Sequence, residues 1–254
     1  MGRYNFKFGD SWISELGAIS TETPGIEIAQ RDYELIDIPG KDGADYIDNG
    51  RYSNVEFSRS ISLIGRKNFP VEDKAANFIN NYAYLQGYHP FEDTDHNDMV
   101  TEAVLTNFNE INRKLRTLNT ATLKFSRKPY WYLKSGLNYR EIDLSPEVPI
   151  IDFDNPFPVI SKPLILITTS PGSPLAFQYK ITTVEGESAY DCIGVSGNVT
   201  LTIDCEKGTA VVGSSVYAPF DIPDGFGIGR SSFQISSGKN RIASVRIAPR
   251  WRCL

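Results

Sequence analysis

The sequence is poor in the residues that hold small folds together covalently or through metals. Its 254 residues include only three cysteines, Cys192, Cys205 and Cys253, and no two of them have C-x-x-C spacing. An odd number of cysteines without that spacing predicts neither a disulfide framework nor a thiolate zinc site. We therefore expect synthesis in a reducing compartment.

Long hydrophobic runs and an excess of positive charge are also lacking. Residues 1–7 contain no apolar stretch of the signal-peptide kind, and apolar runs such as residues 164–167 are far too short to cross a bilayer. The net charge of −5 does not supply the clustered cations that bind nucleic acid or anionic membranes. We expect no secretion signal, no membrane insertion and no general affinity for DNA.

What is present is an ordinary globular composition with an aromatic segment near mid-chain. Apolar residues make up 41% and charged residues 22% of a chain long enough for two domains. Pro129 ends the strand before it, and three aromatic rings follow at residues 130–132, where a flexible linker would carry Gly, Ser and charge. We interpret residues 124–133 as a stiff junction between domains at residues 1–133 and 134–254. The alternative is an ordinary core strand that happens to be aromatic.

The first half predicts a mostly β domain with one helix. Apolar and polar residues alternate in several short runs, which is typical of half-buried strands. These runs span residues 4–8, 26–28, 33–38, 55–63, 99–108 and 114–125. Residues 39–43 suit a tight turn, and residues 109–113 turn between the last two strands. Residues 71–86 hold apolar side chains at helical spacing, so we expect a helix there that lies on the sheet and ends before Gly87.

The second half predicts an antiparallel β-sandwich. Its proline-rich segment at residues 146–163 can carry only short or edge strands. Further short apolar runs recur with Gly or Pro between them. They span residues 142–144, 164–168, 176–182, 191–194, 199–203, 210–212, 232–235 and 241–247. The predicted fold class is therefore mainly β throughout.

The most acidic stretch, residues 89–98, offers two imidazoles and four carboxylates. Three of its residues fit the opening of a calcium loop, namely Asp93, Asp95 and Asn97. The sixth position of such a loop should be Gly and is Asp98, and the twelfth should be Glu and is Val104. Because the match fails where the geometry requires it, we predict a solvated loop after the helix rather than a metal site.

No other pattern supplies the residues that catalysis requires. The glycine-rich residues 225–229 lack the strand, the helix and the Lys-Ser/Thr pair of a phosphate loop, and we interpret them as a flexible loop. Ser196 does not lie in a nucleophile elbow, and both histidines lie in the other half of the chain. Carboxylate pairs suited to glycoside cleavage stay open, because a sequence does not show their separation. We expect no enzyme, and therefore no catalytic, cofactor-binding or metal-binding residue.

Several motifs occur in the order and spacing of one known family. In the first half they are Tyr4-Asn5-Phe6, the turn at residues 38–43, the helix at 71–86 and the segment at 125–131. In the second half they are residues 199–204, Phe233, residues 238–242 and residues 248–252. Together they resemble the distal tail proteins (Dit, the baseplate hub) of siphophages that infect Gram-positive bacteria, and a lactococcal phage member is the most similar. The segment Phe233-Gln234-Ile235 departs from the family's apolar-Pro-aliphatic pattern, which puts the pairing of that strand in doubt.

The resemblance implies a structural protein of the virion, located at the phage tail tip (the baseplate) and made in the host cytoplasm. Residues 1–133 would have a tail-tube-like β fold and form a hexameric ring, and residues 134–254 would form a galectin-like sandwich at its periphery. The ring would join the tail tube protein to a tail-associated protein of the tail fibre or lysin type, and to baseplate or receptor-binding proteins. DNA would pass through the lumen without specific binding, which an acidic ring favours because it repels phosphates.

A carbohydrate-binding adhesin of the tail tip is the alternative function. It would need an exposed aromatic platform beside polar side chains, and Trp251 and Tyr217 are the candidates. Trp251, however, is better explained by packing inside the sandwich. A cell-wall hydrolase, the third class, would need an acid pair or a metal, which the sequence does not show.

Overall fold

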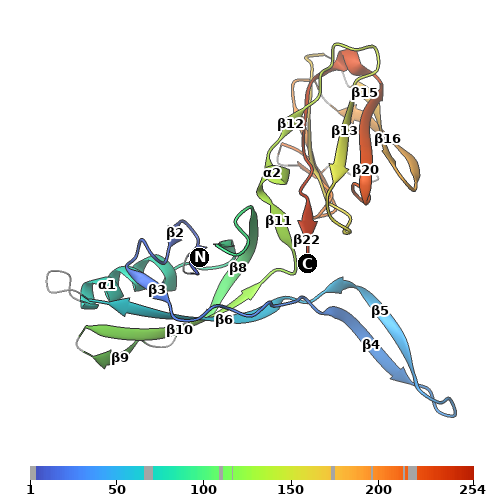
Figure 1. The fold of residues 1–254 in the computed structure, drawn as a ribbon. Coiled ribbons are helices and arrows are strands. Elements are labelled where there is room, and N and C mark those ends of the chain that lie inside the picture. Colours follow the sequence, from blue (N-terminus) through green and yellow to red (C-terminus); the bar gives the residue numbers. More distant parts are fainter. Residues whose placement is uncertain are drawn as a thin grey trace. The chain divides into compact units, whose positions relative to one another are not determined.

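The computed structural model describes residues 4–65, 71–108, 111–115, 117–172, 175–195, 197–213, 215–216 and 222–254. The chain forms two compact units (Figure 1). The first comprises residues 1–131 together with Leu254, and the second comprises residues 132–253. The division lies within the aromatic segment that the sequence indicates as a junction.

The first unit is built on an antiparallel sheet. Its strands are β1 (Phe6–Phe8), β2 (Ser11–Trp12), β3 (Ala18–Ser20), β6 (Val55–Ile64), β7 (His89–Asp93), β8 (Met99–Asn107), β9 (Asn112–Leu115) and β10 (Leu118–Arg127). Their order in space is β2-β1-β7-β8-β10-β6-β3, and β9 pairs with β10. The longest pairing joins β6 to β10 without a register shift, from Val55 opposite Arg127 to Ile64 opposite Leu118. These two strands, in which buried and exposed side chains alternate along much of their length, are the longest of the unit.

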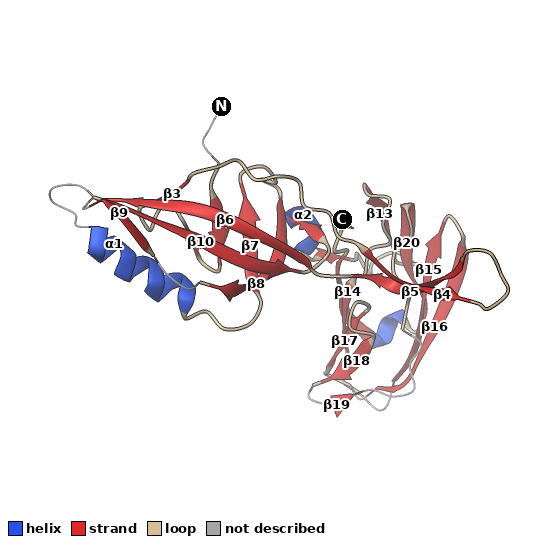
Figure 2. Ribbon diagram, turned by 90° about the horizontal axis from the view of Figure 1, so that it is seen from below, coloured by secondary structure: helices blue, strands red, loops and turns tan. Residues whose placement is uncertain are grey.

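Aromatic rings fill the core of this unit. Alternate residues of the strands point inward, so that Phe57 lies 5.1 Å from Phe91 and 5.2 Å from Phe125, measured between ring centroids. The helix α1 (Val71–Phe78) runs along the sheet and continues as a π-helix, η1 (Ile79–Ala83) (Figure 2). Phe78 and Tyr82 on its inner face are fully buried. The prediction of one helix laid on a sheet is confirmed.

The helix departs from the predicted α-helix at residues 71–86 in its second half. The α-helical part ends at Phe78, and the π-helix takes over before Gly87, whose φ is +83°. Asn81 donates from Nδ2 to the Asn77 carbonyl oxygen at 2.8 Å and to its Oδ1 at 2.9 Å. Asparagine side chains compete for backbone groups in this way, which makes a regular α-helix less favourable here.

Several strand predictions were wrong in detail. Residues 26–28 form no strand, and residues 114–125 are divided between β9 and β10 instead of forming one strand. The predicted solvated loop at residues 89–98 begins with a strand, β7, that lies inside the sheet. The sequence analysis also missed β5 (Ala44–Tyr52), which pairs with β4 (Arg31–Asp37), because Asp, Asn and Gly interrupt its alternation.

The second unit contains two antiparallel sheets, as the sequence predicts for a sandwich. One has the order β12-β21-β14-β17-β18-β19 and the other the order β13-β20-β15-β16. The strands of the first are β12 (Arg140–Glu141), β14 (Leu164–Thr169), β17 (Thr200–Asp204), β18 (Thr209–Val212), β19 (Ser215–Val216) and β21 (Ile242–Ala248). Those of the second are β13 (Ile150–Asn155), β15 (Leu175–Thr183), β16 (Gly186–Val195) and β20 (Gly229–Ser237).

The remaining elements of this unit are short. They are α2 (Lys134–Leu137), η2 (Lys239–Arg241) and β22 (Arg252–Cys253), together with the end of β11 (Trp131–Leu133). The proline-rich segment carries only the edge strand β13, as predicted. The departure at Phe233-Gln234-Ile235 does not disturb β20, which pairs with both β13 and β15 through these residues.

Inward-facing residues of both sheets form one core in the second unit. Ile165, Ile167 and Leu201 from one sheet and Phe177 and Phe233 from the other are at most 2% exposed. Such alternating burial defines the two inner faces of a sandwich. The predicted fold class, mainly β with one helix in the first half and an antiparallel sandwich in the second, is confirmed.

Candidate assembly surface

The most unusual surface in the described residues is a β-hairpin formed by β4 and β5, which we call the arm. Its two strands pair only with each other, and neither contains a buried residue. Gly40 and Gly43 adopt positive φ angles of 85° and 78° in the connecting turn, as predicted for residues 39–43. An isolated two-stranded hairpin is only marginally stable in water. The arm therefore requires further contacts in order to keep this conformation.

Apolar side chains lie on both faces of the arm. On one face, the rings of Tyr33 and Tyr46 lie 5.2 Å apart, and Leu35 is directly opposite Tyr46. On the other face, Ile36 and Ile47 are 43% and 45% exposed. Tyr33, Leu35 and Tyr46 are exposed by 50%, 61% and 54%. Clustered exposed apolar groups of this kind mark interaction surfaces.

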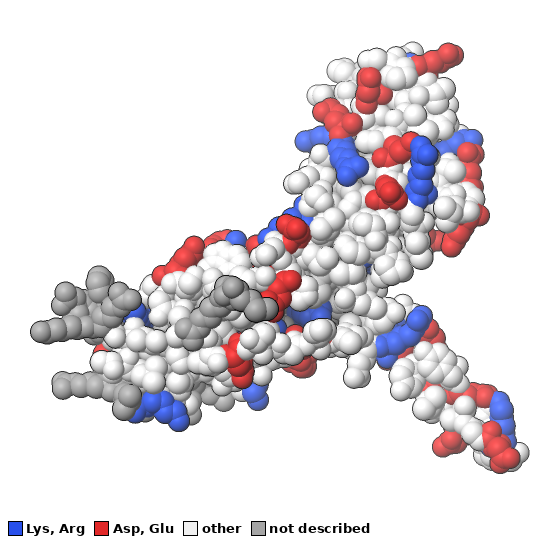
Figure 3. All heavy atoms as spheres, in the orientation of Figure 1, with Lys and Arg blue, Asp and Glu red and all other residues white. Residues whose placement is uncertain are grey.

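Charged groups lie between these apolar side chains. The arm, from residue 31 to residue 52, contains six acidic and three basic residues. Arg31 pairs with Asp48 at 2.6 Å and Arg51 pairs with Asp32 at 2.5 Å, both across the hairpin. Figure 3, in the orientation of Figure 1, shows blue and red side chains at intervals along the arm with white residues between them. Both pairs join the two strands, and the apolar groups remain available to a partner.

Two buried arginines hold the chain segment that leads into the arm. Arg59 donates from Nη1 to Oε1 of Glu27 at 2.6 Å and from Nη2 to Oε2 at 3.1 Å. Arg127 donates from Nη2 to the carbonyl oxygen of Glu27 at 2.9 Å. The guanidinium of Arg59 also stacks over the ring of Phe57 at 4.5 Å. A bidentate pair of this geometry fixes Glu27, and with it the base of the arm.

Arg59 also links this anchored segment, which we call the arginine clamp, to Tyr4 just before β1. It donates from Nε to the hydroxyl of Tyr4 at 2.9 Å, and Tyr4 in turn donates to Oδ2 of Asp93 at 3.4 Å. Burial raises the pKa of Tyr4 well above its ordinary value of 10.0, although the nearby Arg59 opposes that shift. The hydroxyl therefore keeps its proton at neutral pH and can donate to the carboxylate.

The acidic stretch at residues 89–98 has a structural role in this network. Asp93 is buried, and its Oδ1 accepts from the backbone N–H of Asp95 and His96 at 3.1 and 2.8 Å. The His96 ring stacks on Trp131 with a centroid distance of 4.6 Å. Asp93 closes a turn rather than opening a calcium loop. Among the described residues, no group of three or more His, Cys, Asp and Glu side chains is placed to hold a metal ion.

The glycine-rich segment at residues 225–229 is a loop that leads into β20, and one of its residues enters the sandwich core. Phe226 is fully buried and stacks on Phe153 with a centroid distance of 4.6 Å. A Cβ atom on Gly225 would lie 2.0 Å from the carbonyl oxygen of Ser161, so only glycine fits. These glycines allow two chain segments to approach closely and do not form a phosphate loop.

The candidate residues for sugar stacking and nucleophilic catalysis do not form a site in the described residues. Trp251 is only 3% exposed and packs against Phe153 and Phe226, as predicted. It therefore offers no platform to a saccharide. Tyr217 and Ser196 lie outside the described residues.

Two of the free cysteines, Cys192 and Cys205, are buried. Burial raises the pKa of the Cys205 thiol to about 12 and also raises the pKa of Cys192, so neither of these buried free thiols is activated as a nucleophile. None of the helices in the described residues has the length and apolar character needed to cross a membrane.

The sequence analysis missed the arm as a functional surface. Its signal is an excess of exposed aliphatic and tyrosine residues in two strands that also carry Asp and Glu at every second or third position. Such a pattern does not assign either face to a core, because both faces mix apolar and charged groups. The exposure of these side chains becomes visible only in the structure, where β4 and β5 pair with each other and with no other strand.

The whole chain is similar in fold to the solved structure of the Dit protein (gp 19.1) of phage SPP1, described as a paradigm of the hub adsorption apparatus in phages that infect Gram-positive bacteria. The TM-score is 0.66 at 10% sequence identity, and the match covers 97% of this chain and 98% of that chain. No protein-family model matches the sequence. No curated protein sequence matches it either. The likeness shows that both units, in this order, have the Dit-like fold.

Proposed function

We propose that this protein is a structural hub of a phage tail adsorption apparatus. The observation that carries this proposal is the fold likeness to SPP1 Dit, which spans nearly the full length of both chains. Fold alone does not determine function, since one fold can support many activities. The arm supplies independent support, because a hub must bind several partners and the arm is a surface that requires one.

The hub would be a ring of identical subunits, and the resemblance of the sequence to distal tail proteins gives six as the expected number. Each arm would lie on the neighbouring subunit and bury its apolar residues there. A contact between two different surfaces of identical chains closes into a ring when the rotation between the copies allows it. Burial of Leu35 and the Tyr33–Tyr46 pair would supply the hydrophobic contribution that the free arm lacks.

The remaining parts of the proposal concern location and partners. The protein would lie at the tail tip of the virion, between the tail tube protein and the tail-associated, baseplate or receptor-binding proteins. DNA would pass through the ring, and the net charge of −5 disfavours adhesion of its phosphates. We propose no catalytic activity, since the hub role requires only shape and contacts.

The mass of the purified full-length chain in solution tests the ring. Light scattering should give a mass near six copies of the 28.4 kDa chain. Leu35→Asp places a charge at the centre of the arm's apolar face, and we expect it to shift the mass towards that of a single chain. The matched control is Val184→Asp, which changes a side chain of similar exposure in the turn between β15 and β16 of the second unit.

Two results would contradict the proposal. One is a single-chain mass at every protein concentration, which would exclude a self-assembling ring. The other is an oligomer that Leu35→Asp leaves intact, which would show that the arm is not its contact surface. Circular dichroism of both variants checks that each chain stays folded.

A further inference from the structure

The second unit has a long strand at the edge of a sheet, β16, whose outer side is unpaired in the described part of the chain. β16 is the last strand of its sheet and pairs only with β15. Its 10 residues follow β15 without a register shift from Gly186, opposite Thr183, to Ile193, opposite Ala176. The N–H and C=O groups along the outer side of an edge strand can pair with another chain.

The other described edges of this unit are short or flanked by proline. Strands β12 and β19 have two residues each, and β13 has six. Pro149 and Pro156 flank β13 directly. β16 contains neither proline nor lysine, the residues that commonly protect an edge from pairing. Of these edges, β16 is therefore the one best suited to accept another strand.

The hairpin turn shows which backbone groups of β16 face outward. A two-residue turn joins β15 to β16, so Thr183 and Gly186 are the pair that closes it. The closing pair of such a hairpin exchanges its backbone hydrogen bonds, and so does every second pair after it. The backbone groups of residues 187, 189 and 191 consequently point away from β15 and are free to bond to an added strand.

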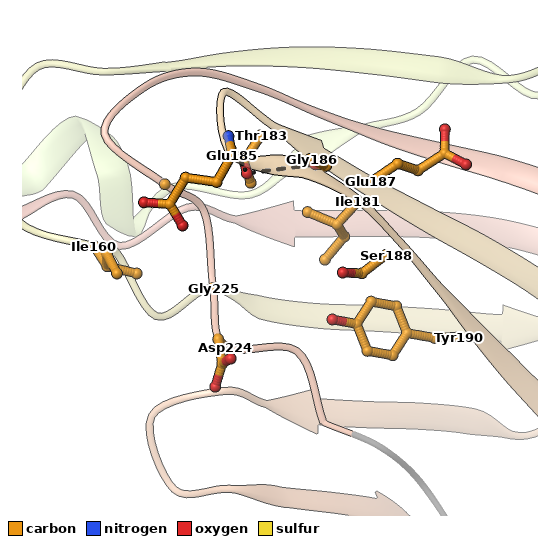
Figure 4. Close-up of a pocket in the computed structure, with 11 residues that line it drawn as sticks. Ile160, Ile181, Thr183, Glu185, Gly186, Glu187, Ser188, Tyr190, Asp224 and Gly225 are labelled. Atoms are coloured by element: carbon orange, nitrogen blue, oxygen red, sulfur yellow. Dashed lines mark hydrogen bonds between the residues drawn. The ribbon is translucent and has the colours of Figure 1, made fainter.

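The side chains of this strand make the outer face of the edge acidic. Glu187 and Asp191 lie on the face of the sheet that points away from the core, and Figure 4 shows the Glu187 carboxylate pointing away from Ser188. Lys180 Nζ lies 2.6 Å from Oε1 of Glu187, and Gln178 Nε2 donates to Oδ1 of Asp191 at 2.8 Å. Within the described residues the second oxygen of each carboxylate has no partner. Both carboxylates can therefore accept from a cation on an added strand.

Exposed apolar side chains lie near both ends of β16. Val184 in the turn is 71% exposed, and Ile193 near the other end of the strand is 70% exposed. An added strand would cover part of this apolar surface as well as the unpaired backbone.

The charge pattern disfavours a second copy of the same strand as the partner. If two copies of β16 paired antiparallel about Ala189, Glu187 of one copy would lie opposite Asp191 of the other. Like charges directly opposite each other destabilise a strand pair. A strand that carries cations at alternate positions would instead place them opposite these two carboxylates.

We propose that β16 binds an extended segment of another protein, in which Lys or Arg alternates with uncharged residues. The segment would extend the sheet β13-β20-β15-β16 by one strand. In binding of this kind the backbone hydrogen bonds supply affinity and the alternating side chains supply specificity. The inference does not depend on the ring, because β16 lies in the second unit and the arm in the first.

Three ten-residue peptides with a fluorescent label test the proposal against the full-length chain. The probe alternates Lys and Thr, the first control alternates Glu and Thr, and the second control has the probe's composition with its lysines consecutive. We expect fluorescence anisotropy to give the probe a dissociation constant of about tens of micromolar, at least about tenfold below either control. Amide hydrogen exchange in residues 186–195 should slow when the probe binds.

Two variants separate the backbone and the charge contributions. Ala189→Pro removes an outward N–H group but no bond to β15, and it should weaken probe binding by about tenfold or more. Asp191→Lys reverses a charge on the outer face and should weaken binding by about tenfold. The matched control is Asp154→Lys, the same charge change at an exposed position of β13, which should leave binding unchanged.

Four results would overturn the proposal. The first is no binding of the probe at a concentration of about 1 mM. The second is equal binding of the two lysine peptides, which would show attraction by charge alone. The third is binding that leaves amide exchange in residues 186–195 unchanged, and the fourth is equal affinity of Asp191→Lys and Asp154→Lys. If circular dichroism shows that Ala189→Pro does not fold, the exchange data and the two lysine variants still decide.

Discussion

Single residues fix the close approaches on which both units depend. Gly225 is the clearest case, because its φ of +130° and the carbonyl oxygen of Ser161 together leave no room for a side chain. Arg59 is another, since its guanidinium joins Glu27 and Tyr4 in the first unit. In both cases the cost of a substitution follows from an observed contact rather than from residue type.

Gly225→Ala should therefore destabilise the second unit more than Gly229→Ala. Both glycines have positive φ, which costs an alanine about 1–2 kcal/mol. Gly229 has open space around its Cβ position, whereas a Cβ on Gly225 would overlap Ser161 and force the chain apart. We expect a loss of about 3 kcal/mol or more in the free energy of unfolding for Gly225→Ala. Equal denaturation midpoints for the two variants would contradict the steric argument.

Acid should weaken the second unit through Asp204. Burial favours a higher pKa for this carboxyl group, but the hydrogen bond and the charge of Arg250, 2.7 Å away, outweigh burial and hold the pKa below its ordinary 3.8. A carboxyl group with a lower pKa in the folded state stabilises the fold above its unfolded pKa. That contribution is lost as the pH falls through the folded pKa.

Thermal denaturation of the wild type and Asp204→Asn checks this sign. The midpoint of the wild type should be higher at pH 7, and the gap should shrink once the pH falls below 3.8. The control is Asp152→Asn, which breaks a 2.6 Å ion pair with Arg230 that lies on the surface. Its gap should be small at every pH, because exposed pairs contribute about 0–1 kcal/mol. A gap for Asp204→Asn that stays constant down to pH 2 would refute the assignment.

At the scale of elements, the arm depends on its anchored base. Glu27→Ala removes the carboxylate from Arg59, which is left buried and without this partner. Breaking a buried pair typically costs about 3–5 kcal/mol. We expect a smaller loss here, because the Glu27 side chain is 27% exposed. Limited trypsin digestion should cut at Lys41 or Arg51 in the arm earlier than in the wild type.

Glu22→Ala is the matched control for the arm's base. Glu22 is exposed and precedes the segment that the two arginines hold. Its removal should change neither the denaturation midpoint nor the digestion pattern. If Glu27→Ala behaves like Glu22→Ala, the arginine clamp does not determine the stability of the arm.

The elements also show which parts of the fold can be predicted from sequence. A strand with one buried face, such as β6, follows alternation and was found, because burial selects its residues. The strand predicted at residues 114–125 covered most of β10 but also included the end of β9. Strand β5 has no buried face, so no alternation reveals it. Strand β7 was taken for a loop because a proline precedes Phe91 and acidic residues follow it, which hides its burial in the sequence. The start of α1 was predictable from its apolar spacing, but the change to a π-helix was not.

The candidate site was harder to predict than the fold. Trp251 was correctly assigned to the core, since a large aromatic ring near a chain end usually packs inward. The arm surface depends on side chains that strand pairing brings together. Residue types alone do not show such proximity.

At the scale of the whole molecule, the two units differ in how much apolar surface they leave exposed. The first unit carries the arm, with apolar groups exposed on both faces. The second unit has a continuous core between two sheets, and the edge strand β13 follows prolines that discourage further pairing. We therefore expect self-assembly to depend on the first unit, and the second unit to bind other components.

Separate expression of the two units tests this division. The cut belongs between Trp131 and Tyr132, because Leu133 donates its backbone N–H to the carbonyl oxygen of Trp251 at 2.9 Å within the second unit. The Tyr132 hydroxyl also bonds to Glu206 there. Residues 1–131 should form hexamers or larger rings, since the arm remains attached to its base. Residues 132–254 should be folded and monomeric.

The measured masses distinguish the possible outcomes. Leu35→Asp in the first fragment should abolish its rings, as in the full chain, because the same contact is removed. If residues 132–254 form the oligomer and residues 1–131 stay monomeric, the assignment of ring and periphery is reversed. If neither fragment assembles while the full chain does, the ring requires contacts from both units, and the arm alone is insufficient to close it.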